Sequence, residues 1–565
     1  MSKQKLLLLL LLMLNSFDAK AWDDMKYWQP LPQYPIYRLV PDTTTTLPDV
    51  TRIETRGTRK GIIGVIYPMF CMGKDSAEIR AKIKYKAVDC QSLAIVMTTL
   101  GAGERVQSTK KLVLPITDEW TEMSCNVIAK DAYYLYVYIE AEGVNNEVPG
   151  KIYVAGIDVT SDGRKLERKT DCFQAKKINP ADLVPLDKMM HLPIMDKKIL
   201  ALGETAHGTE TLCGMAMSLM KERILNHGCK LIMMETSMMA SLSMNRYIKN
   251  DERFKLSDIS KDFNTSIFSD SIVSFLQWLK AYNSTHHNEV SMFGFDRGDI
   301  WATTSIPLDV FDFLYTLNTQ RVASVDTICK KMLDTEYKDV DLLPLLDNNH
   351  DLERLVTKEE MVLLRYCFSQ MKKKPFIFRV AERDEKMAEI VELIAGLYLT
   401  PATTATLYSH FLHSDYLSDP RTLSMICSTM GGLLKERYPK DYACIGLATC
   451  KGSACFINKE NTGHEFLPLQ SAPIGSLEYE IASKYDGAAF MPMDALSDND
   501  IFMLRTSGAT HADDQFMYAV PKARMDGIIV VPSASPSKKS KANGKNPNDI
   551  WFERYRAAMD KVKPK

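Results

Sequence analysis

The chain has 565 residues, of which 45% are hydrophobic and 25% charged, a composition typical of a globular protein with more than one domain. Its 70 Lys and Arg residues nearly balance its 71 Asp and Glu residues, so no overall charge favours nucleic acid or another strongly charged polymer. The 12 Cys residues include no CxxC pair, which argues against a zinc or redox motif of that kind.

Residues 1–21 have the pattern of a cleavable signal peptide. The segment "MSKQKLLLLLLLMLNSFDAKAW" combines a basic start, an apolar run from Leu6 to Leu14, and small residues at Ala19 and Ala21. We predict cleavage after Ala21 and a secreted or periplasmic protein. The apolar run is too short to span a bilayer, and no later segment approaches the roughly 18 apolar residues that a span needs, so we predict no membrane insertion.

Residues 22–180 are predicted to form an all-β, sandwich-like domain. Short runs such as "EIRAKIKYKA", "SLAIVMTTL", "YYLYVYIEAEG" and "KIYVAGIDVTS" alternate apolar and polar positions between turn signals, as half-buried antiparallel strands do. The residues do not reveal a binding role for this domain.

Disulfides between Cys71 and Cys90 or between Cys450 and Cys455 are compatible with export, as is a role for these cysteines as small buried side chains.

Residues 181–565 are predicted to form an α/β domain with a parallel sheet. "KKILALGE", a helical stretch with one apolar stripe, and "KLIMMET" make a strand–helix–strand unit of about forty residues. Further strands are predicted at "VSMFGFD", "TATLYSH", "YACIGLA" and "GIIVVP". The region from about 300 to 395 has a helical pattern and is predicted to be a helical cap or insert.

Ionisable residues follow four of these predicted strands. In parallel α/β sheets, ligands bind outside the carboxyl ends of the strands, and clustered ionisable groups are a common mark of function. Each residue taken alone has a structural explanation, such as a helix cap, a salt bridge or a surface position. The set that we expect to meet at one edge of the sheet consists of Glu204, His207, Glu235, Asp296, Arg297, His410 and His413.

These residues occur in an order that resembles the erythromycin esterase family, over about residues 180–535. The resemblance rests on Gly-Glu-x-x-His-Gly-Thr at 203–209, a strand-end Glu235, Gly-Phe-Asp at 294–296, Arg-Asp-x-x-Met-Ala at 383–388, His-x-x-His at 410–413, and "MGGLLKERYPKDYACIGLA". It implies a hydrolase of esters or macrolactones that acts on a small molecule without a cofactor. It implies catalytic roles for Glu204, His207, Glu235, His410 and His413, and substrate binding by Asp296, Arg297, Arg383 and Asp384.

The chain departs from the family pattern at four positions. Ala216 and Glu210 stand where the family commonly has basic residues, Phe411 replaces a small polar neighbour of the first paired histidine, and Ile390 replaces an asparagine. The acid-base groups are retained, so the departures leave the substrate open more than the chemistry.

We predict that His207, held by Glu204 or Glu235, takes a proton from a water molecule that attacks an ester carbonyl. His410 would stabilise the oxyanion, with His413 in support. The sequence contains no GxSxG elbow, the motif that would indicate a serine nucleophile.

Two alternatives stay open. The same Glu and His residues could hold zinc in a metal-dependent hydrolase or peptidase. Alternatively, Ala216 and Phe411 would suit an exported binding protein that has lost turnover. The oligomeric state is not predicted.

Overall fold

A computed structural model of the chain describes most of its residues. The described residues are 37–42, 44–45, 47, 50–55, 61–63, 77–100, 106–130, 132, 134–145, 148–165, 176–259, 269–297, 306–334, 342–371, 380–416, 429–458, 464–497, 500, 502–509, 511, 515–538 and 547–562. The predicted signal peptide at 1–21 therefore lies outside them. The described part contains no helix with the length and apolar character that a membrane crossing requires.

The chain forms two compact units. The described residues from 37 to 165 belong to the first unit, and those from 176 to 562 belong to the second. Each unit has its own sheets and is described separately.

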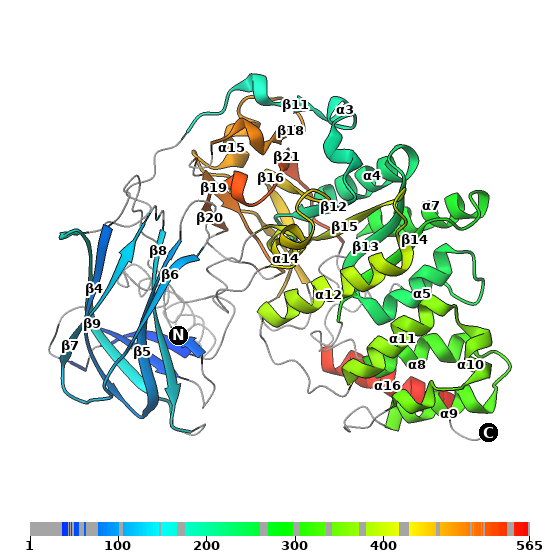
Figure 1. Ribbon diagram of the computed structural model, residues 1–565, viewed down its shortest axis with the longest axis horizontal. Coiled ribbons are helices and arrows are strands. Elements are labelled where there is room, and N and C mark those ends of the chain that lie inside the picture. Colours follow the sequence, from blue (N-terminus) through cyan, green and yellow to red (C-terminus); the bar gives the residue numbers. More distant parts are fainter. Residues whose placement is uncertain are drawn as a thin grey trace, which may run out of the picture. The chain divides into compact units, whose positions relative to one another are not determined.

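The first unit is built from two antiparallel sheets (Figure 1). One sheet has the order β1-β2-β9-β4-β7 with β10 beside β9, and the other has the order β3-β8-β5-β6. Strand β4 alternates buried and outward-facing residues, which is the pattern of a strand with one face in the core. The strands are β1 (Tyr37–Pro41), β2 (Thr51–Thr55), β3 (Gly61–Ile63), β4 (Ala77–Val88), β5 (Cys90–Leu100), β6 (Val106–Val113), β7 (Thr121–Ala129), β8 (Tyr134–Gly143), β9 (Lys151–Ser161) and β10 (Arg164–Lys165).

Neither of the two disulfides considered from the sequence is formed. Cys90 and Cys450 both carry free thiols, and Cys90 is buried. Cys71 lies outside the described residues. Cys90 and Cys455 are buried, as expected of small interior side chains, whereas Cys450 is partly exposed.

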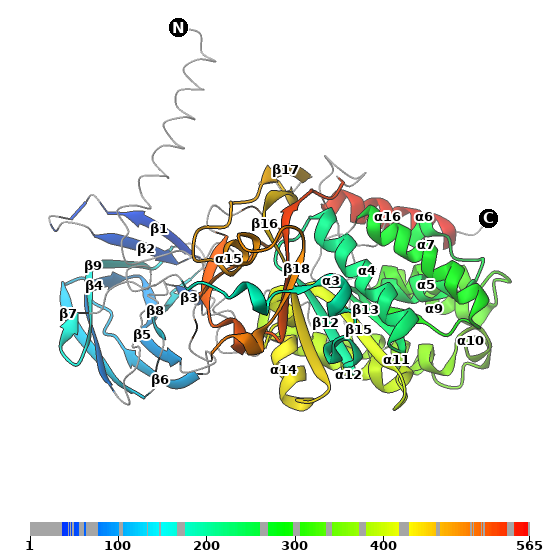
Figure 2. The same ribbon diagram turned by 90° about the horizontal axis from the view of Figure 1, so that it is seen from above.

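The second unit is organised around a mixed sheet of order β11-β18-β21-β16-β12-β15-β13-β14, with β17 beside β16 (Figure 2). The six strands from β21 to β14 run parallel. At one edge β18 pairs antiparallel with β21, and β11 pairs antiparallel with β18, so β11 again runs in the direction of the six. The strands are β11 (Val184–Pro185), β12 (Ile199–Glu204), β13 (Cys229–Ser237), β14 (Ser291–Asp296), β15 (Thr404–His410), β16 (Tyr442–Ile457), β17 (His464–Pro468), β18 (Ala489–Pro492), β19 (Phe502–Arg505), β20 (Phe516–Ala519) and β21 (Gly527–Ala534).

Helices cover both faces of this sheet. Helix α4 (Glu210–Asn226) joins β12 to β13 and packs with α7 (Asp270–Thr285) on one face, while α12 (Val380–Tyr398), α13 (Phe411–Ser414) and α14 (Met430–Arg437) pack on the other. All six residues of β12 are buried because the strand is covered on both faces.

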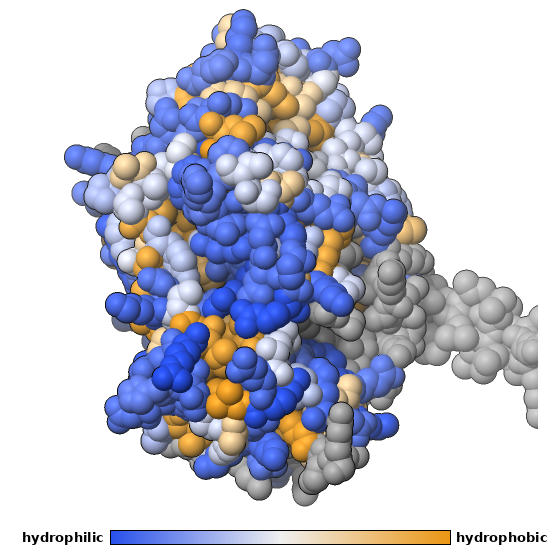
Figure 3. All heavy atoms as spheres, turned by 90° about the vertical axis from the view of Figure 1, so that its right-hand side faces the viewer, coloured by the Kyte–Doolittle hydropathy of each residue, from blue (hydrophilic) through white to orange (hydrophobic). Residues whose placement is uncertain are grey.

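Further helices lie between β14 and β15 and at the C-terminus. Their outer side, seen in Figure 3, is mainly hydrophilic with scattered apolar residues, as is usual for a solvent-facing surface. The remaining helices of the unit are α3 (Leu186–Met189), α5 (Met238–Ile248), α6 (Leu256–Ile259), α8 (Ile306–Leu317), α9 (Ala323–Asp334), α10 (His350–Leu355), α11 (Lys358–Met371), α15 (Leu477–Ala482) and α16 (Pro547–Val562).

A β-bulge interrupts β13 where it carries Glu235. Met234 pairs with Gly294 of β14, but Ser237 pairs with Asp296, so β13 contains one residue more than its partner over this stretch. Such a bulge redirects the side chains at the end of a strand. Gly294 makes the bulge possible, because a Cβ atom at this position would lie 2.2 Å from the carbonyl oxygen of Thr236.

We expect Gly294→Ala to lower the free energy of unfolding of the second unit by about 1–3 kcal/mol, because the added methyl group must displace backbone. Urea unfolding followed by far-UV circular dichroism measures the change. Gly156→Ala in β9 is the control, since a Cβ atom there has no neighbour within 4 Å. Equal losses of stability in the two variants would contradict the steric explanation.

Candidate active site

Glu204 and His207 form a buried carboxylate–imidazole pair at the end of β12. Nδ1 of His207 lies 2.6 Å from Oε1 of Glu204, and the side chains are 8% and 2% exposed. The other ring nitrogen, Nε2, makes no hydrogen bond to any residue that the structure describes. With Nδ1–H donated to the carboxylate, Nε2 carries the free lone pair of the neutral ring.

The turn after β12 fixes the backbone of this pair. His207 donates its backbone N–H to the carbonyl oxygen of Ser507 at 3.1 Å. Gly208 follows with a φ of +72°, and a Cβ atom there would lie 2.1 Å from the carbonyl oxygen of Cys455. Only glycine satisfies both conditions without strain, so the turn that presents His207 depends on it.

His410 lies between the two halves of the site. One half is the Glu204–His207 pair, and the other contains Glu235, Asp296, Arg383, Asp384 and His413. Its ring centroid is 4.5 Å from that of His207 and 6.5 Å from that of His413. Nε2 of His410 is 3.1 Å from the carbonyl oxygen of Ser507, and Nδ1 accepts the backbone N–H of Leu412, so both nitrogens are engaged. Burial, followed by the neighbouring imidazoles, holds the pKa of His410 well below 6.5, which keeps the ring neutral.

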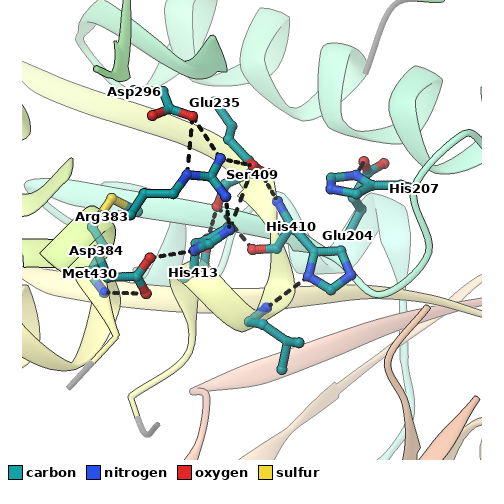
Figure 4. A network of polar contacts seen from close by, with 12 residues as sticks. Glu204, His207, Glu235, Asp296, Arg383, Asp384, Ser409, His410, His413 and Met430 are labelled. Carbon is teal, nitrogen blue, oxygen red and sulfur yellow. Dashed lines mark hydrogen bonds and ion pairs between the residues drawn. The ribbon is translucent and has the colours of Figure 1, made fainter. Parts of the chain in front are cut away.

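Arg383 occupies the centre of the second half of the site (Figure 4). Its guanidinium donates to Oδ2 of Asp296 at 2.6 and 3.2 Å and to Oε1 of Glu235 at 2.9 Å. The two carboxylates are 0% and 2% exposed. Burial acts to lower the pKa of Arg383, but the adjacent carboxylates outweigh it and raise the pKa, so the arginine stays charged.

His413 forms a second carboxylate–imidazole pair. Its Nδ1 lies 2.6 Å from Oδ1 of Asp384, while Oδ2 of that aspartate accepts the backbone N–H of Met430 at the start of α14. Nε2 lies 3.2 Å from Nη1 of Arg383 and 3.6 Å from Oε1 of Glu235. Burial and Arg383 lower the pKa of His413, but Asp384 and Glu235 outweigh them and raise the pKa above 6.5.

Glu235 connects the two halves. Its Oε2 accepts the backbone N–H of His410 at 2.8 Å, and its Oε1 faces Arg383 and His413. Burial would raise the pKa of Glu235, but the charges of His413 and Arg383 are stronger together and hold it well below the usual range. Glu204 differs, because burial is its dominant influence and raises its pKa. The two glutamates therefore occupy electrostatically distinct positions.

The structure thus brings together Glu204, His207, Glu235, Asp296, Arg383, Asp384, His410 and His413. Arg297, which was predicted to bind substrate, directly follows Asp296 in the sequence and is also buried. The carboxylate of Asp296 pairs with Arg383. The sequence left open whether Glu204 or Glu235 holds His207. The carboxylate that is hydrogen-bonded to the His207 ring is that of Glu204.

Sequence reasoning missed two groups of the site. Tyr408 donates its hydroxyl to Oε2 of Glu204. Its place two residues before His410, on the same face of β15, could have indicated this role. The carbonyl of Ser507 accepts hydrogen bonds from His207 and His410. A backbone acceptor in an irregular segment leaves no residue-type signal.

The donor set does not suit a zinc ion as it is arranged here. Within the described ranges, no group of three His, Cys, Asp or Glu side chains is placed to hold a metal. Arg383 supplies the positive charge between Glu235 and Asp296, and both nitrogens of His410 are already engaged. A metal at this position would have to displace these partners.

Comparison with known proteins gives the family. The family profile described as erythromycin esterase matches residues 224–534, more than half of the chain. The chain belongs to the erythromycin esterase family. The match includes Glu235, Asp296, Arg383 and both paired histidines, whereas Glu204 and His207 precede it and join the site through the contacts described above.

Three solved structures are similar to the chain over most of their own length. A Bacillus cereus protein shares 17% identity, covering 64% of this chain and 96% of its own, with a TM-score of 0.47. A succinoglycan biosynthesis protein shares 18% identity, covering 64% and 94%, with a TM-score of 0.47. A variant of the erythromycin esterase EreC in its open conformation shares 16% identity, covering 65% and 99%, with a TM-score of 0.45. No curated protein matched the chain.

The departures from the erythromycin esterase pattern have structural explanations. Phe411 is buried against Gly203, where a Cβ atom would lie 2.9 Å from the Phe411 Cα atom. Glu210 accepts hydrogen bonds from the backbone N–H and hydroxyl of Ser271 near the start of α7. Ala216 and Ile390 are fully buried core residues. These four positions therefore serve packing and capping in this chain.

His410 should make this family member less stable as the pH falls. A histidine with a lowered folded-state pKa contributes stability that is present above its unfolded pKa of about 6.5 and is lost below it. Between about pH 7 and pH 5 this amounts to at most about 2 kcal/mol. We expect His410→Asn, whose side chain can still accept the Leu412 N–H, to make the unfolding free energy less dependent on pH.

Urea unfolding at several pH values measures this effect. His350→Asn is the matched control, because the side chain of His350 is 78% exposed in the same unit. A pH dependence in His410→Asn that equals that of the wild type would show that His410 is protonated freely in the folded protein.

Proposed function

We propose that the protein is an exported, metal-independent carboxylic ester hydrolase in which His207 activates water against an ester or lactone. The hydrogen bond between Glu204 and Nδ1 of His207 carries the proposal, because it leaves Nε2 as the basic nitrogen. Family membership supports a hydrolase. The predicted signal peptide supports export.

Each half of the site has a part in the proposed reaction. As the water oxygen bonds to the carbonyl carbon, Nε2 of His207 takes a water proton and the carbonyl oxygen becomes an oxyanion. The imidazolium then returns this proton to the alkoxide as the carbon–oxygen bond breaks, which gives an acid and an alcohol. Glu204 stabilises the imidazolium and fixes its orientation, as a carboxylate does for a catalytic histidine.

Positive charge for the oxyanion is assigned to Arg383 and His413. Both have raised pKa values, against burial, because carboxylates surround them, and their side chains are 14% and 11% exposed. Fixed charges in a nearly buried site stabilise developing negative charge without reorganisation. The sequence predicted this role for His410, but burial holds the pKa of His410 well below 6.5, so its ring carries no positive charge to offer an oxyanion. We therefore assign His410 to holding the two halves together.

The proposed substrate class is a small ester or lactone. Arg383 provides the guanidinium of this site, while position 216 contributes a buried alanine and no charge. Family members commonly have a basic residue at this position, and a substrate that depends on its charge is disfavoured here. We therefore do not restrict the proposed substrate to macrolides.

We expect His207→Ala to lower kcat/KM for any hydrolysed ester by about 10²–10⁴-fold, because proton transfer by a positioned side chain contributes that much. A panel of aryl esters, alkyl esters and macrolactones provides the assay. His227→Ala is a matched control, since His227 Nδ1 also lies 2.6 Å from a carboxylate, that of Asp196, at the other end of α4. This variant should keep full activity.

Two results would oppose the proposal. Turnover that survives in His207→Ala would remove the general base. Absence of any His207-dependent turnover, together with tight binding of one ligand, would favour the exported binding protein that the sequence left open.

We expect hydrolysis to continue after prolonged incubation with a chelator, because the proposed reaction passes through His207 and water alone. Metal analysis of the purified protein accompanies the assay. Loss of activity on chelation that is restored by zinc would instead support the metal-dependent alternative.

A further inference from the structure

Both oxygens of the Glu204 carboxylate have a partner. Oε1 faces Nδ1 of His207 at 2.6 Å, and Oε2 accepts the hydroxyl of Tyr408. Tyr408 lies on β15, which pairs in parallel with β12 so that Glu204 is beside His410 and Leu202 is beside Tyr408. The phenol therefore approaches the carboxylate from the neighbouring strand, on the side away from His207.

Buried polar groups lie behind the hydroxyl of Tyr408. The Cys213 thiol of α4 is near enough to raise the pKa of Tyr408, and the Cys213 sulfur lies 2.8 Å from the hydroxyl oxygen of Ser269. Ser269 in turn caps α7 by accepting the backbone N–H of Ile272 at 3.2 Å. All these side chains are buried, so the chain of polar groups from α7 to Glu204 is shielded from water.

Tyr408 remains a donor at all relevant pH values. Burial, followed by the neighbouring Cys213 and Glu204, raises the pKa of Tyr408 well above 10. A hydrogen bond donated to a carboxylate stabilises its charged form, and this opposes the burial that raises the pKa of Glu204. The same bond restricts rotation of the carboxylate, because Oε2 must stay at the phenol.

We infer that Tyr408 is a positioning residue: its hydroxyl keeps Oε2 of Glu204 occupied and ionised, so that Oε1 orients His207 with Nε2 free to accept a proton. The link to catalysis rests on the proposed function. The effect on His207 does not, because it is a property of the resting protein.

Tyr408→Phe tests the inference by removing only the hydroxyl. A carboxylate that has lost this donor attracts the proton of the Glu204–His207 pair more strongly, so the pair gains that proton at a higher pH. We expect the apparent pKa of the pair to rise by about one pH unit, the size that follows from one hydrogen bond to a charged group. Histidine-selective labelling and NMR titration measure it, with the His207 signal identified by its loss in His207→Asn.

Tyr442→Phe is the matched control. Tyr442 is also fully buried in the same sheet, but its hydroxyl donates to the carbonyl oxygen of Ser414 at 2.8 Å and does not contact Glu204. Its variant should leave the His207 titration unchanged. Equal titration of His207 in the wild type and in Tyr408→Phe would overturn the inference.

A fluorinated tyrosine at position 408 tests the same bond in a variant of nearly unchanged shape. Its more acidic hydroxyl is a stronger donor, so the pair should gain its proton at a lower pH than in the wild type, opposite to Tyr408→Phe. A shift in the same direction for both variants would count against the inference, and this test holds even if Tyr408→Phe fails to fold.

Kinetics separates this inference from the proposed function. For any ester that is hydrolysed, the acidic limb of kcat/KM should move to higher pH in Tyr408→Phe, with kcat reduced and KM little changed. If no ester is hydrolysed, the proposed function fails, while the His207 titration still decides the role of Tyr408.

Discussion

The site depends on the burial of four carboxylates at one edge of a parallel sheet, which is costly unless each has a partner. An ionised carboxylate that leaves water loses several kcal/mol of solvation, and only close charges and hydrogen bonds offset this loss. Arg383 offsets it for Glu235 and Asp296, and His413 does so for Asp384. Glu204 has no cation as a partner among these groups. It is held by two neutral donors, the hydroxyl of Tyr408 and the uncharged imidazole of His207. Three of the four carboxylates are therefore held by cations. The proton affinity of the fourth, Glu204, depends on its hydrogen bonds to neutral groups.

The parallel pairing of the central strands explains why the chemistry-bearing residues could be predicted from sequence. Each of the runs that ends in Glu204, Glu235, Asp296 or His410 is a short apolar segment, and the structure has a strand at each of them. Because parallel strands end at the same edge, the side chains that follow them must meet. The ordered motifs added Arg383 and Asp384, which lie on a helix and carry no strand-end signal.

Other features could not be read from the residues. Strand β7 was missed because the first half of "TEMSCNVIA" does not alternate buried and exposed positions. The bulge in β13 depends on the register with β14, which is a property of two strands together. The choice of Glu204 over Glu235 as the partner of His207 depends on which carboxylate the folded turn after β12 brings to Nδ1. The engagement of His410 by the Ser507 carbonyl similarly required three-dimensional contacts.

The packing of Phe411 has a consequence for substitutions in this part of the core. Its ring lies against Gly203 of β12 and 3.6 Å from where a Cβ atom of Gly446 of β16 would be, so two neighbouring strands of the sheet have glycine where this side chain packs. Installing a small polar residue at 411 alone would empty that space at a cost of about 3–5 kcal/mol. A substitution of Phe411 therefore has to be combined with changes at the two glycines.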